Sequence, residues 1–202
     1  MVTFGDVTSV VLLCGVLVSL QHGVVVAQDA APESACMAGV VKRSAWGAAK
    51  STNVTYQLKP VPTVIVHHTT GDRCMSAPGC RELVRNIQTY HQTQNGWSDI
   101  GYNFLIGSSF VYEGIGWHRA GAHLRGRNDK SIGVAFIGNY DLERPTARQL
   151  QLLNTLLQCG VELGELSDEY RLYGAMQLQS TNSPGKFLHA KLQEHDHWRE
   201  DI

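Results

Sequence analysis

The sequence predicts an α/β fold in which a mixed central β-sheet is flanked by about three helices. The chain has 202 residues, of which 43% are apolar and 17% charged, and this suits one globular domain with a sizeable core. Segments typical of strands alternate with segments of helical periodicity, which indicates the α/β class. No internal repeat or low-complexity tract interrupts this alternation.

The first residues are expected to be a leader. Residues 10–20 form an uncharged apolar run, and Ala27 follows as a small residue at a possible cleavage point. The length fits a signal-peptide core better than a membrane span, and the polar pair Gln21 and His22 disfavours an anchor. We therefore expect a secreted, extracellular protein with no membrane partner. Its expected parts are a signal peptide (1–27), an N-terminal segment (28–44) and a folded domain (45–202).

The first strong elements are a strand and a helix. Residues 63–67 are mostly β-branched and lie between Pro62 and a polar stretch, which is typical of a buried strand. Between residues 81 and 94, apolar side chains recur at helical spacing. The helix is expected to bury one stripe, bordered by His91 and formed by Leu83, Val84, Ile87 and Tyr90.

The alternation continues to the end of the chain. Residues 102–106 and 110–112 predict a hairpin, and residues 132–137 predict another buried strand. Leucines at helical spacing predict a helix over 146–161. The last expected elements are a strand at 172–175 and a helix at 185–198 with Phe187, Leu188 and Leu192 facing inward.

The charges of the chain are balanced. There are 17 Lys and Arg residues against 18 Asp and Glu residues, and removal of residues 1–27 deletes one acid, Asp6, and no base. Non-specific binding of nucleic acid requires a strongly basic surface. We therefore expect no DNA or RNA partner.

Four cysteines follow the expected leader, namely Cys36, Cys74, Cys80 and Cys159. An even number in an oxidising compartment indicates two disulfides, for which three pairings are possible. The turn-rich stretch between Cys74 and Cys80 can close a small loop, which favours Cys74–Cys80 together with Cys36–Cys159. The second bridge would close a long loop and so restrict the unfolded chain.

Histidines are the first candidates for chemistry. His67 ends a predicted strand, His91 lies on a predicted helix, and His123 follows two small residues. Together they suggest a metal site, although each one alone is better explained as a hydrogen-bonded pocket or core histidine. His195 and His197 are two residues apart and do not share a helix face, so we expect them on the solvated surface.

Several motifs resemble those of the peptidoglycan recognition proteins, innate-immune relatives of zinc-dependent phage amidases. They occur in the family's order from Trp46 to Trp198 and include Val-Ile-Val-His-His-Thr (64–69), Tyr-His-Gln (90–92), Trp-Ser-Asp-Ile-Gly-Tyr-Asn-Phe-Leu-Ile-Gly (97–107), Val-Tyr-Glu-Gly (111–114), Gly-Ala-His (121–123) and Ile-Gly-Val-Ala-Phe-Ile-Gly (132–138). The resemblance implies an amidase-like peptidoglycan recognition domain, and its family pattern includes disulfides that match both favoured pairs.

The resemblance also implies what a zinc site would require. Catalytic members bind zinc through a His at the end of the first strand, a His after the last strand and a Cys eight positions further, and a Tyr assists. His67 and Tyr102 match two of these positions, but Ala175 and Ser183 occupy the other two. A methyl group has no lone pair and a neutral hydroxyl is a poor zinc ligand. The expected protein therefore has no zinc or other cofactor and no amidase activity.

Three alternatives stay open at this point. The first is an active zinc-dependent N-acetylmuramoyl-L-alanine amidase that degrades peptidoglycan. The second is a metal-free serine-type peptidase that acts on the stem peptide, with the Ser183 hydroxyl activated by His67. It requires the two side chains within hydrogen-bond reach. The third is a structural or scavenger module.

Ligand-binding residues follow from the motif matches. In the family, a groove presents polar and aromatic side chains to a muramyl sugar and its peptide stem, which offer amides, hydroxyls and flat faces. The matching positions are His67, His68, Thr69, His91, Gly96, Trp97, Tyr102, Ile115, His123 and Asn128.

Two indicators of ligand type disagree. Gly96-Trp97 matches the pattern of members that bind diaminopimelate-type peptidoglycan, but Ile115 replaces the Arg that would pair with the extra carboxylate. We give the missing charge more weight and expect Lys-type peptidoglycan. By analogy, the receptor would trigger a Toll-type pathway with other recognition proteins upstream of a protease cascade.

Overall fold

The structure is a computed structural model that describes residues 35–200. A six-stranded mixed sheet runs in the order β1-β4-β3-β5-β2-β6. Strands β3 and β4 pair antiparallel, and the remaining described pairs are parallel. The strands are β1 Val40–Val41, β2 Val61–His68, β3 Phe104–Ile106, β4 Val111–Glu113, β5 Ile132–Phe136 and β6 Leu166–Gly174. This architecture confirms the predicted fold class.

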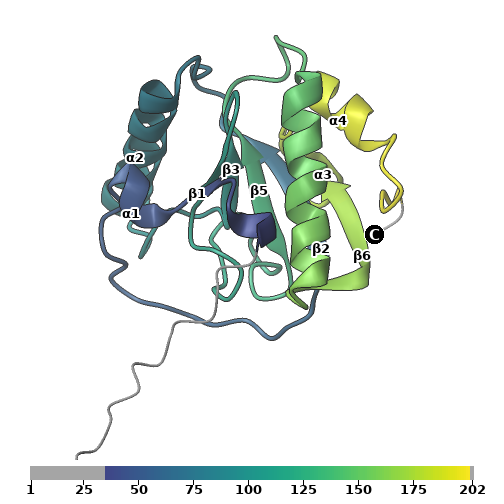
Figure 1. The fold of residues 1–202 in the computed structure, drawn as a ribbon, viewed down its shortest axis with the longest axis horizontal. Coiled ribbons are helices and arrows are strands. Elements are labelled where there is room, and N and C mark those ends of the chain that lie inside the picture. Colours follow the sequence, from purple (N-terminus) through teal and green to yellow (C-terminus); the bar gives the residue numbers. More distant parts are fainter. Residues whose placement is uncertain (1–34, 201–202) are drawn as a thin grey trace, which may run out of the picture. The chain divides into compact units, whose positions relative to one another are not determined.

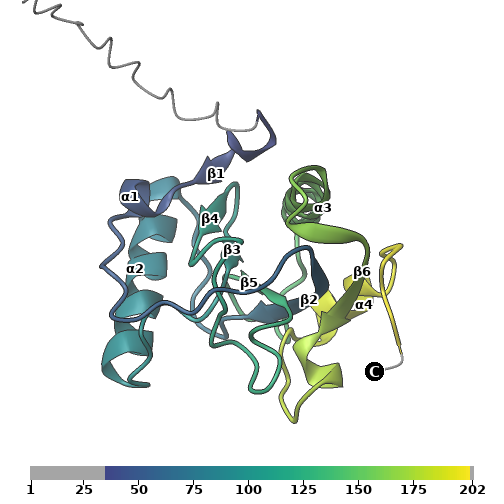
Figure 2. The ribbon, with the colours of Figure 1, turned by 90° about the horizontal axis from the view of Figure 1, so that it is seen from below.

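The helices lie on both faces of the sheet. They are α1 Arg43–Trp46, α2 Ala77–Thr93, α3 Ala147–Glu162 and α4 Lys186–Leu192, with short 3₁₀ turns η1 Ala35–Met37 and η2 Ala175–Gln177. Figures 1 and 2 show α1 and α2 on one side of the sheet and α3 and α4 on the other. The expected signal peptide lies outside the described residues. Within residues 35–200, no helix is long and apolar enough to cross a membrane.

Strand β2 lies between β5 and β6 in the sheet, and both of its faces are covered by other parts of the chain. Val64 and Val66 pack in the cluster that includes α3 and α4, whereas Ile65 lies in a separate cluster with Ala175. A strand covered on both faces reads as a continuous apolar run, which explains why the sequence predicts it clearly. The predicted strand at 63–67 is confirmed and extends from Val61 to His68.

Helix α2 corrects one prediction about burial. Its buried side is formed by Cys80, Val84, Gln88 and His91, and the amide of Gln88 donates to Asp99 Oδ1 at 2.6 Å. Tyr90, predicted in the buried stripe, is 58% exposed. The sequence pattern misled because a buried Gln reads as polar while an exposed Tyr reads as apolar.

The C-terminal elements differ most from the prediction. Strand β6 begins at Leu166, six residues before the predicted start at 172. The sequence pattern missed the first half of the strand because that half carries exposed polar side chains. Helix α4 ends at Leu192 and not at 198. The following segment runs beside β6, where Leu172 N donates to His197 O at 2.9 Å and Arg199 N donates to Leu172 O at 3.2 Å.

The same segment corrects the expectation for the two C-terminal histidines. His195 and His197 are partly buried and not fully solvated. The ring of His197 stacks on Tyr170 with a centroid distance of 3.9 Å and an interplanar angle of 10°.

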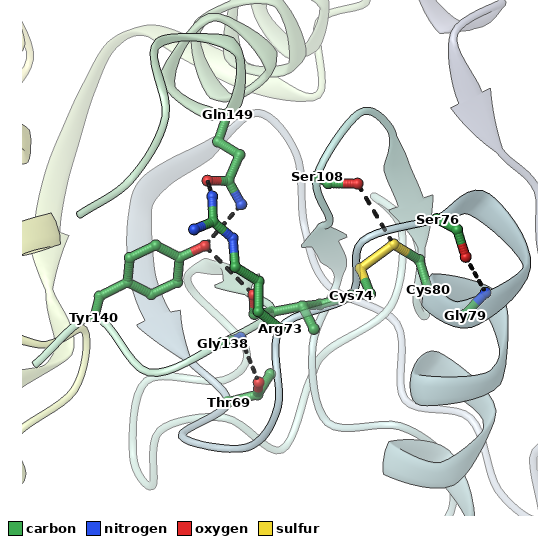
Figure 3. Close-up of a disulfide and its surroundings, with 11 residues drawn as sticks. Thr69, Arg73, Cys74, Ser76, Gly79, Cys80, Ser108, Gly138, Tyr140 and Gln149 are labelled. Carbon is green, nitrogen blue, oxygen red and sulfur yellow. Dashed lines mark hydrogen bonds between the residues drawn. A yellow bond between two sulfur atoms is a disulfide. The ribbon is translucent and has the colours of Figure 1, made fainter. Parts of the chain in front are cut away.

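Residues before the expected domain start also belong to the fold. Strand β1 pairs with β4 at the sheet edge, and η1 packs near α3 through the disulfide Cys36–Cys159. The second disulfide, Cys74–Cys80, closes the turn that leads into α2 (Figure 3). Both bridges follow the favoured pairing.

The turn after β2 is held in place by polar contacts drawn in Figure 3. The Ser76 hydroxyl caps α2 by accepting from Gly79 N at 3.2 Å. The Arg73 guanidinium donates to Gln149 Oε1 at 3.3 Å, and Gln149 Nε2 donates to Tyr140 Oη at 2.7 Å. These contacts join the turn to the start of α3 and leave the end of β2 in a fixed position.

The two disulfides are expected to contribute unequally to stability. Cys36 and Cys159 are 123 residues apart and Cys74 and Cys80 are 6 apart. In the chain-entropy model, loops of these lengths correspond to about 5 and about 2 kcal/mol. We expect Cys36→Ala with Cys159→Ala to lower the free energy of unfolding in urea more than Cys74→Ala with Cys80→Ala. An equal or smaller loss would contradict the model.

Candidate functional site

The site lies at the carboxyl end of β2, where ligands bind in open α/β sheets. His67 and His68 are the last residues of β2, and Thr69 follows. Thr69 N donates to Phe136 O at 3.1 Å and its hydroxyl accepts from Gly138 N at 3.0 Å. This segment is therefore anchored to the end of the parallel neighbour β5.

Five aromatic rings from distant parts of the chain form one continuous row. His67 lies 5.1 Å from His123 and 5.5 Å from Tyr102, measured between ring centroids. Tyr102 lies 5.6 Å from His91, and His91 lies 4.6 Å from Trp97. The structure thus brings together five of the residues that the sequence indicated for ligand binding.

Hydrogen bonds and the close approach of one glycine set the orientation of these rings. His67 Nε2 and His123 Nδ1 are 3.1 Å apart and share one hydrogen bond. His91 Nδ1 accepts from Gly101 N at 3.0 Å, so the neutral ring carries its proton on Nε2. Gly133 allows the close approach of His123, because a Cβ at that position would lie 2.5 Å from the imidazole ring. A glycine inside a strand indicates such an approach, and this signal could have been read from the sequence.

Burial keeps the row uncharged at neutral pH. It lowers the pKa of His91 and His123 to about 4. The pKa of His67 is well below its usual value, chiefly through burial and further through His123 and His68. Burial also raises the pKa of Tyr102 to about 12. The row therefore offers neutral hydrogen-bonding groups and ring faces.

A groove of about 420 Å³ lies between the end of β2 and α2, and two rings of the row, His91 and Tyr102, line it. Four of the predicted residues line it, and five further residues escaped the sequence analysis. The predicted lining residues are His68, Thr69, His91 and Tyr102, and the additional ones are Thr70, Leu83, Asn86, Ile87 and Tyr90. Leu83, Ile87 and Tyr90 are apolar and lie beside the buried stripe of α2, so the apolar side of this helix is wider than its packing requires. That extra width was the sequence signal from which the groove wall could have been predicted.

The remaining predicted residues do not line the groove. His67 and His123 belong to the ring row but line neither the groove nor the second cavity, which contains Trp97. Trp97, Ile115 and Asn128 line a second cavity of about 360 Å³. Asn128 Oδ1 accepts from the amides of His123 and Leu124 at 2.9 and 2.8 Å, so this side chain holds the turn that positions His123. Gly96 lines neither cavity. Its φ of 68° permits the turn that leads to Trp97.

The zinc positions implied by the resemblance do not form a metal site. Val66 pairs with Gly174, so Ala175 directly follows the strand beside β2. Ala175 is fully buried with Ile65, and His67 Nε2 is engaged by His123. Within residues 35–200, no three His, Cys, Asp or Glu side chains are arranged to hold a metal ion. The donors present therefore do not fit zinc.

Ser183 lies beside β2, but its hydrogen bond is not the contact with the His67 imidazole that a serine nucleophile would need. Its hydroxyl accepts from the backbone amide of His68 at 3.0 Å. The imidazole of His67, the proposed base, forms its hydrogen bond with His123. Ser183 thus connects the segment before α4 to the end of β2.

A comparison with protein families places this site in a known group. The model of the N-acetylmuramoyl-L-alanine amidase family (Amidase_2) matches residues 57–186. This range spans β2 to the start of α4 and contains every residue of the ring row.

Named relatives agree with this match. Peptidoglycan-recognition protein 2 of Holotrichia diomphalia is 42% identical over 161 residues, 79% of this chain and 84% of the relative. Peptidoglycan-recognition protein SA of Drosophila melanogaster is 44% identical over 154 residues, 76% of each chain.

Solved structures extend the likeness to the fold. The Drosophila peptidoglycan recognition protein SA structure has a TM-score of 0.79 and 41% identity, covering 81% of this chain and 95% of the other. Peptidoglycan recognition protein LE in complex with tracheal cytotoxin, a monomeric diaminopimelic acid-type peptidoglycan, has a TM-score of 0.79 and 38% identity over 80% and 96% of the two chains. This chain belongs to the peptidoglycan recognition protein family and carries its amidase-like domain.

Proposed function

We propose that this protein is an innate-immune receptor that binds the muramyl stem peptide of bacterial peptidoglycan. The observation that carries the proposal is the row of neutral rings, of which His91 and Tyr102 line the groove between β2 and α2. A peptidyl sugar offers amides, hydroxyls and flat apolar faces to such a surface. The relative bound to a monomeric peptidoglycan supports the same ligand class.

One donor in the groove wall is suited to a ligand carbonyl. His68 Nδ1 accepts from Tyr140 N at 3.2 Å, so the neutral ring carries its proton on Nε2. That Nε2 is buried and has no protein partner among the described residues. A buried unsatisfied donor destabilises a protein by about 1–3 kcal/mol. A ligand acceptor that reaches it would gain a hydrogen bond at little further desolvation.

The proposed receptor has no amidase activity. A zinc hydrolase needs three protein ligands and an open position for water, whereas Ala175 has no donor and the Ser183 hydroxyl contacts His68 N. A serine-type peptidase is not favoured either, because the Ser183 hydroxyl contacts a backbone amide and not the proposed base. The groove is thus proposed for binding alone.

Lys-type peptidoglycan is the proposed ligand. Ile115 is 6% exposed and packs in the cluster that contains Trp46, so this position offers no charge to a diaminopimelate carboxylate. The Arg119 guanidinium lines the same cavity, but its Nε donates to Ile115 O at 2.8 Å and its Nη1 donates to Ser51 Oγ at 2.9 Å. Asp99 Oδ2 lies 3.6 Å from that Nη1. These contacts occupy Arg119 within the protein.

The biological setting is proposed by analogy with the family. Residues 1–27 would direct secretion, and two disulfides support an oxidising compartment. The receptor would act in a Toll-type pathway with other recognition proteins upstream of a protease cascade.

Binding in the groove can be tested by calorimetry with a Lys-type muropeptide. Tyr90 lines the groove and is 58% exposed, so Tyr90→Ala should leave the fold intact and weaken binding by about tenfold through lost contact area. Met75→Ala is the matched control, since Met75 is 81% exposed and does not line the groove. Equal affinities of the two variants would argue against this groove.

Zinc content and peptide release test the absence of amidase activity. Purified protein incubated with zinc is expected to retain well below one ion per chain after dialysis, and to release no stem peptides from peptidoglycan. An Ala175→His, Ser183→Cys variant restores the missing donor types and should retain more zinc. Stoichiometric zinc, or zinc-dependent peptide release by the unmodified protein, would overturn the proposal.

Ligand type can be tested by restoring a cation. We expect Ile115→Arg to raise the affinity for a diaminopimelate muropeptide relative to a Lys muropeptide by about tenfold, through a charge-assisted pair. Ile115→Met controls for altered packing, and Arg119→Gln should leave the ratio unchanged. Preference of the unmodified protein for diaminopimelate, lost in Arg119→Gln, would show that Arg119 reads the carboxylate and that the Lys-type assignment is wrong.

A further inference from the structure

A separate cavity of about 560 Å³ lies on another part of the surface, where β4 leads into the 114–119 segment and α3 leads into β6. It shares no residue with the groove between β2 and α2. It adjoins the cavity beside Trp97, with which it shares Val54, Ile115 and Arg119. Its other lining residues are Met37, Lys42, Tyr56, Glu113, Gly116, Trp117, His118, Leu163 and Glu165.

Two side chains in this cavity carry buried polar atoms without a hydrogen-bond partner among the described residues. Trp117 is 7% exposed, and its indole Nε1–H is one of these atoms. Glu165 is 6% exposed, and its Oε2 is the other. Unsatisfied buried groups are rare in native proteins. One is a donor and one is an acceptor, so a ligand would need both functions.

Contacts with neighbouring residues hold the Trp117 and Glu165 side chains in fixed positions. The Trp117 ring is fixed against Phe104 at a centroid distance of 4.5 Å. Gly160 allows this position, because a Cβ there would lie 2.6 Å from the indole. Glu165 directly precedes β6, and its Oε1 accepts from Lys59 Nζ at 3.0 Å. Both side chains are thus held in the wall of the cavity, with Trp117 Nε1 and Glu165 Oε2 buried in it.

The charge around the cavity disfavours an ionic ligand. Lys59 neutralises Glu165 from one side, and His118 Nδ1 lies 3.3 Å from Oε2. A cationic ligand would face these groups together with Arg119. An anionic ligand would approach the carboxylate of Glu165 directly. A neutral ligand with hydroxyl or amide groups avoids both conflicts.

Tyr56 adds an exposed aromatic face. It lines the cavity and is 74% exposed. Its position is fixed by backbone contacts on either side, since Ala120 N donates to Thr55 O at 2.8 Å and Gln57 N donates to His118 O at 3.0 Å. An aromatic ring beside a carboxylate and an indole donor can contact a flat, weakly polar ring.

We propose that this cavity binds a neutral sugar ring, independently of the muramyl-peptide groove. Once a displacement of the cavity wall exposes these buried atoms, a hydroxyl or acetamide N–H of the sugar would donate to Glu165 Oε2, and a sugar oxygen would accept from Trp117 Nε1–H. The C–H face of the ring would lie on Tyr56. The glycan strand of a cell wall and an acetamide-free glucan share this chemistry, and the test distinguishes them.

The test uses chitotetraose, which carries acetamide groups and no stem peptide, and maltotetraose, which carries hydroxyls only. Each is titrated into ¹⁵N-labelled protein while the indole N–H signals of the four Trp residues are followed. The Trp117 signal is identified by its loss in Trp117→Phe. We expect a saturable shift of this signal. If the acetamide is the contacting group, chitotetraose binds more tightly than maltotetraose. If hydroxyls suffice, the two sugars bind equally.

Variants locate the site. Glu165→Gln, which keeps the side-chain size, and Tyr56→Ala are each expected to weaken sugar binding by about tenfold. Leu58→Ala is the control, because Leu58 is 91% exposed on the same segment and does not line the cavity. Tyr90→Ala should leave sugar binding unchanged while weakening muropeptide binding.

Two results would overturn the inference. One is the absence of a saturable shift of the Trp117 signal with both sugars. The other is sugar binding that survives Tyr56→Ala and Glu165→Gln but is lost in Tyr90→Ala, since the sugar would then occupy the groove. Failure of muropeptide binding would leave the inference intact, because Tyr56, Trp117 and Glu165, which would contact the sugar, do not line the groove between β2 and α2.

Discussion

The parallel pairing of β2 with β5 on one side and β6 on the other is the constraint on which the rest depends. It places β2 inside the sheet, where both faces are covered, and the alternation of side chains decides what each face contacts. One face packs in the cluster that includes α3 and α4, and Ile65 on the other face packs with Leu124 and Ala175. His67 at the end of the strand is thereby directed to the side of α2, where Tyr102 and His91 complete the row. The strand's burial thus determines both the layered core and the position of the groove.

Burial also sets the charge of the imidazoles in this site. A low pKa keeps each buried imidazole neutral, which suits a metal ligand as well as a hydrogen-bonding group. A zinc site differs from this one in the number of donor atoms that converge on a single point. With Ala175 packed against Ile65 and Ser183 directed to a backbone amide, His67 has His123 as its partner. The polar groups are then available to a neutral ligand.

The sequence predicted those parts of the fold whose burial is reflected in a simple pattern. β2, the hairpin of β3 and β4, β5 and α3 were predicted because their apolar residues follow one period. The start of β6 was misjudged because its first half carries exposed polar side chains. The end of α4 was misjudged because the chain after Leu192 leaves the helix and pairs beside Leu172, which is a tertiary contact. The ring row came from motif matches, whereas the α2 wall of the groove was missed because Tyr90 was expected to be buried. Pattern alone does not distinguish an apolar residue that packs from one that lines a groove.

The segment that passes beside β6 has a consequence for crowded conditions. An exposed edge strand of nine residues is a template on which another chain can add a strand and begin aggregation. Residues 197–199 occupy that template at Leu172, and the opposite edge, β1, is two residues long. Molecules that gather at high density on a repetitive polymer would thus find the second half of this edge already occupied. They could cluster through their bound ligand and remain separately folded.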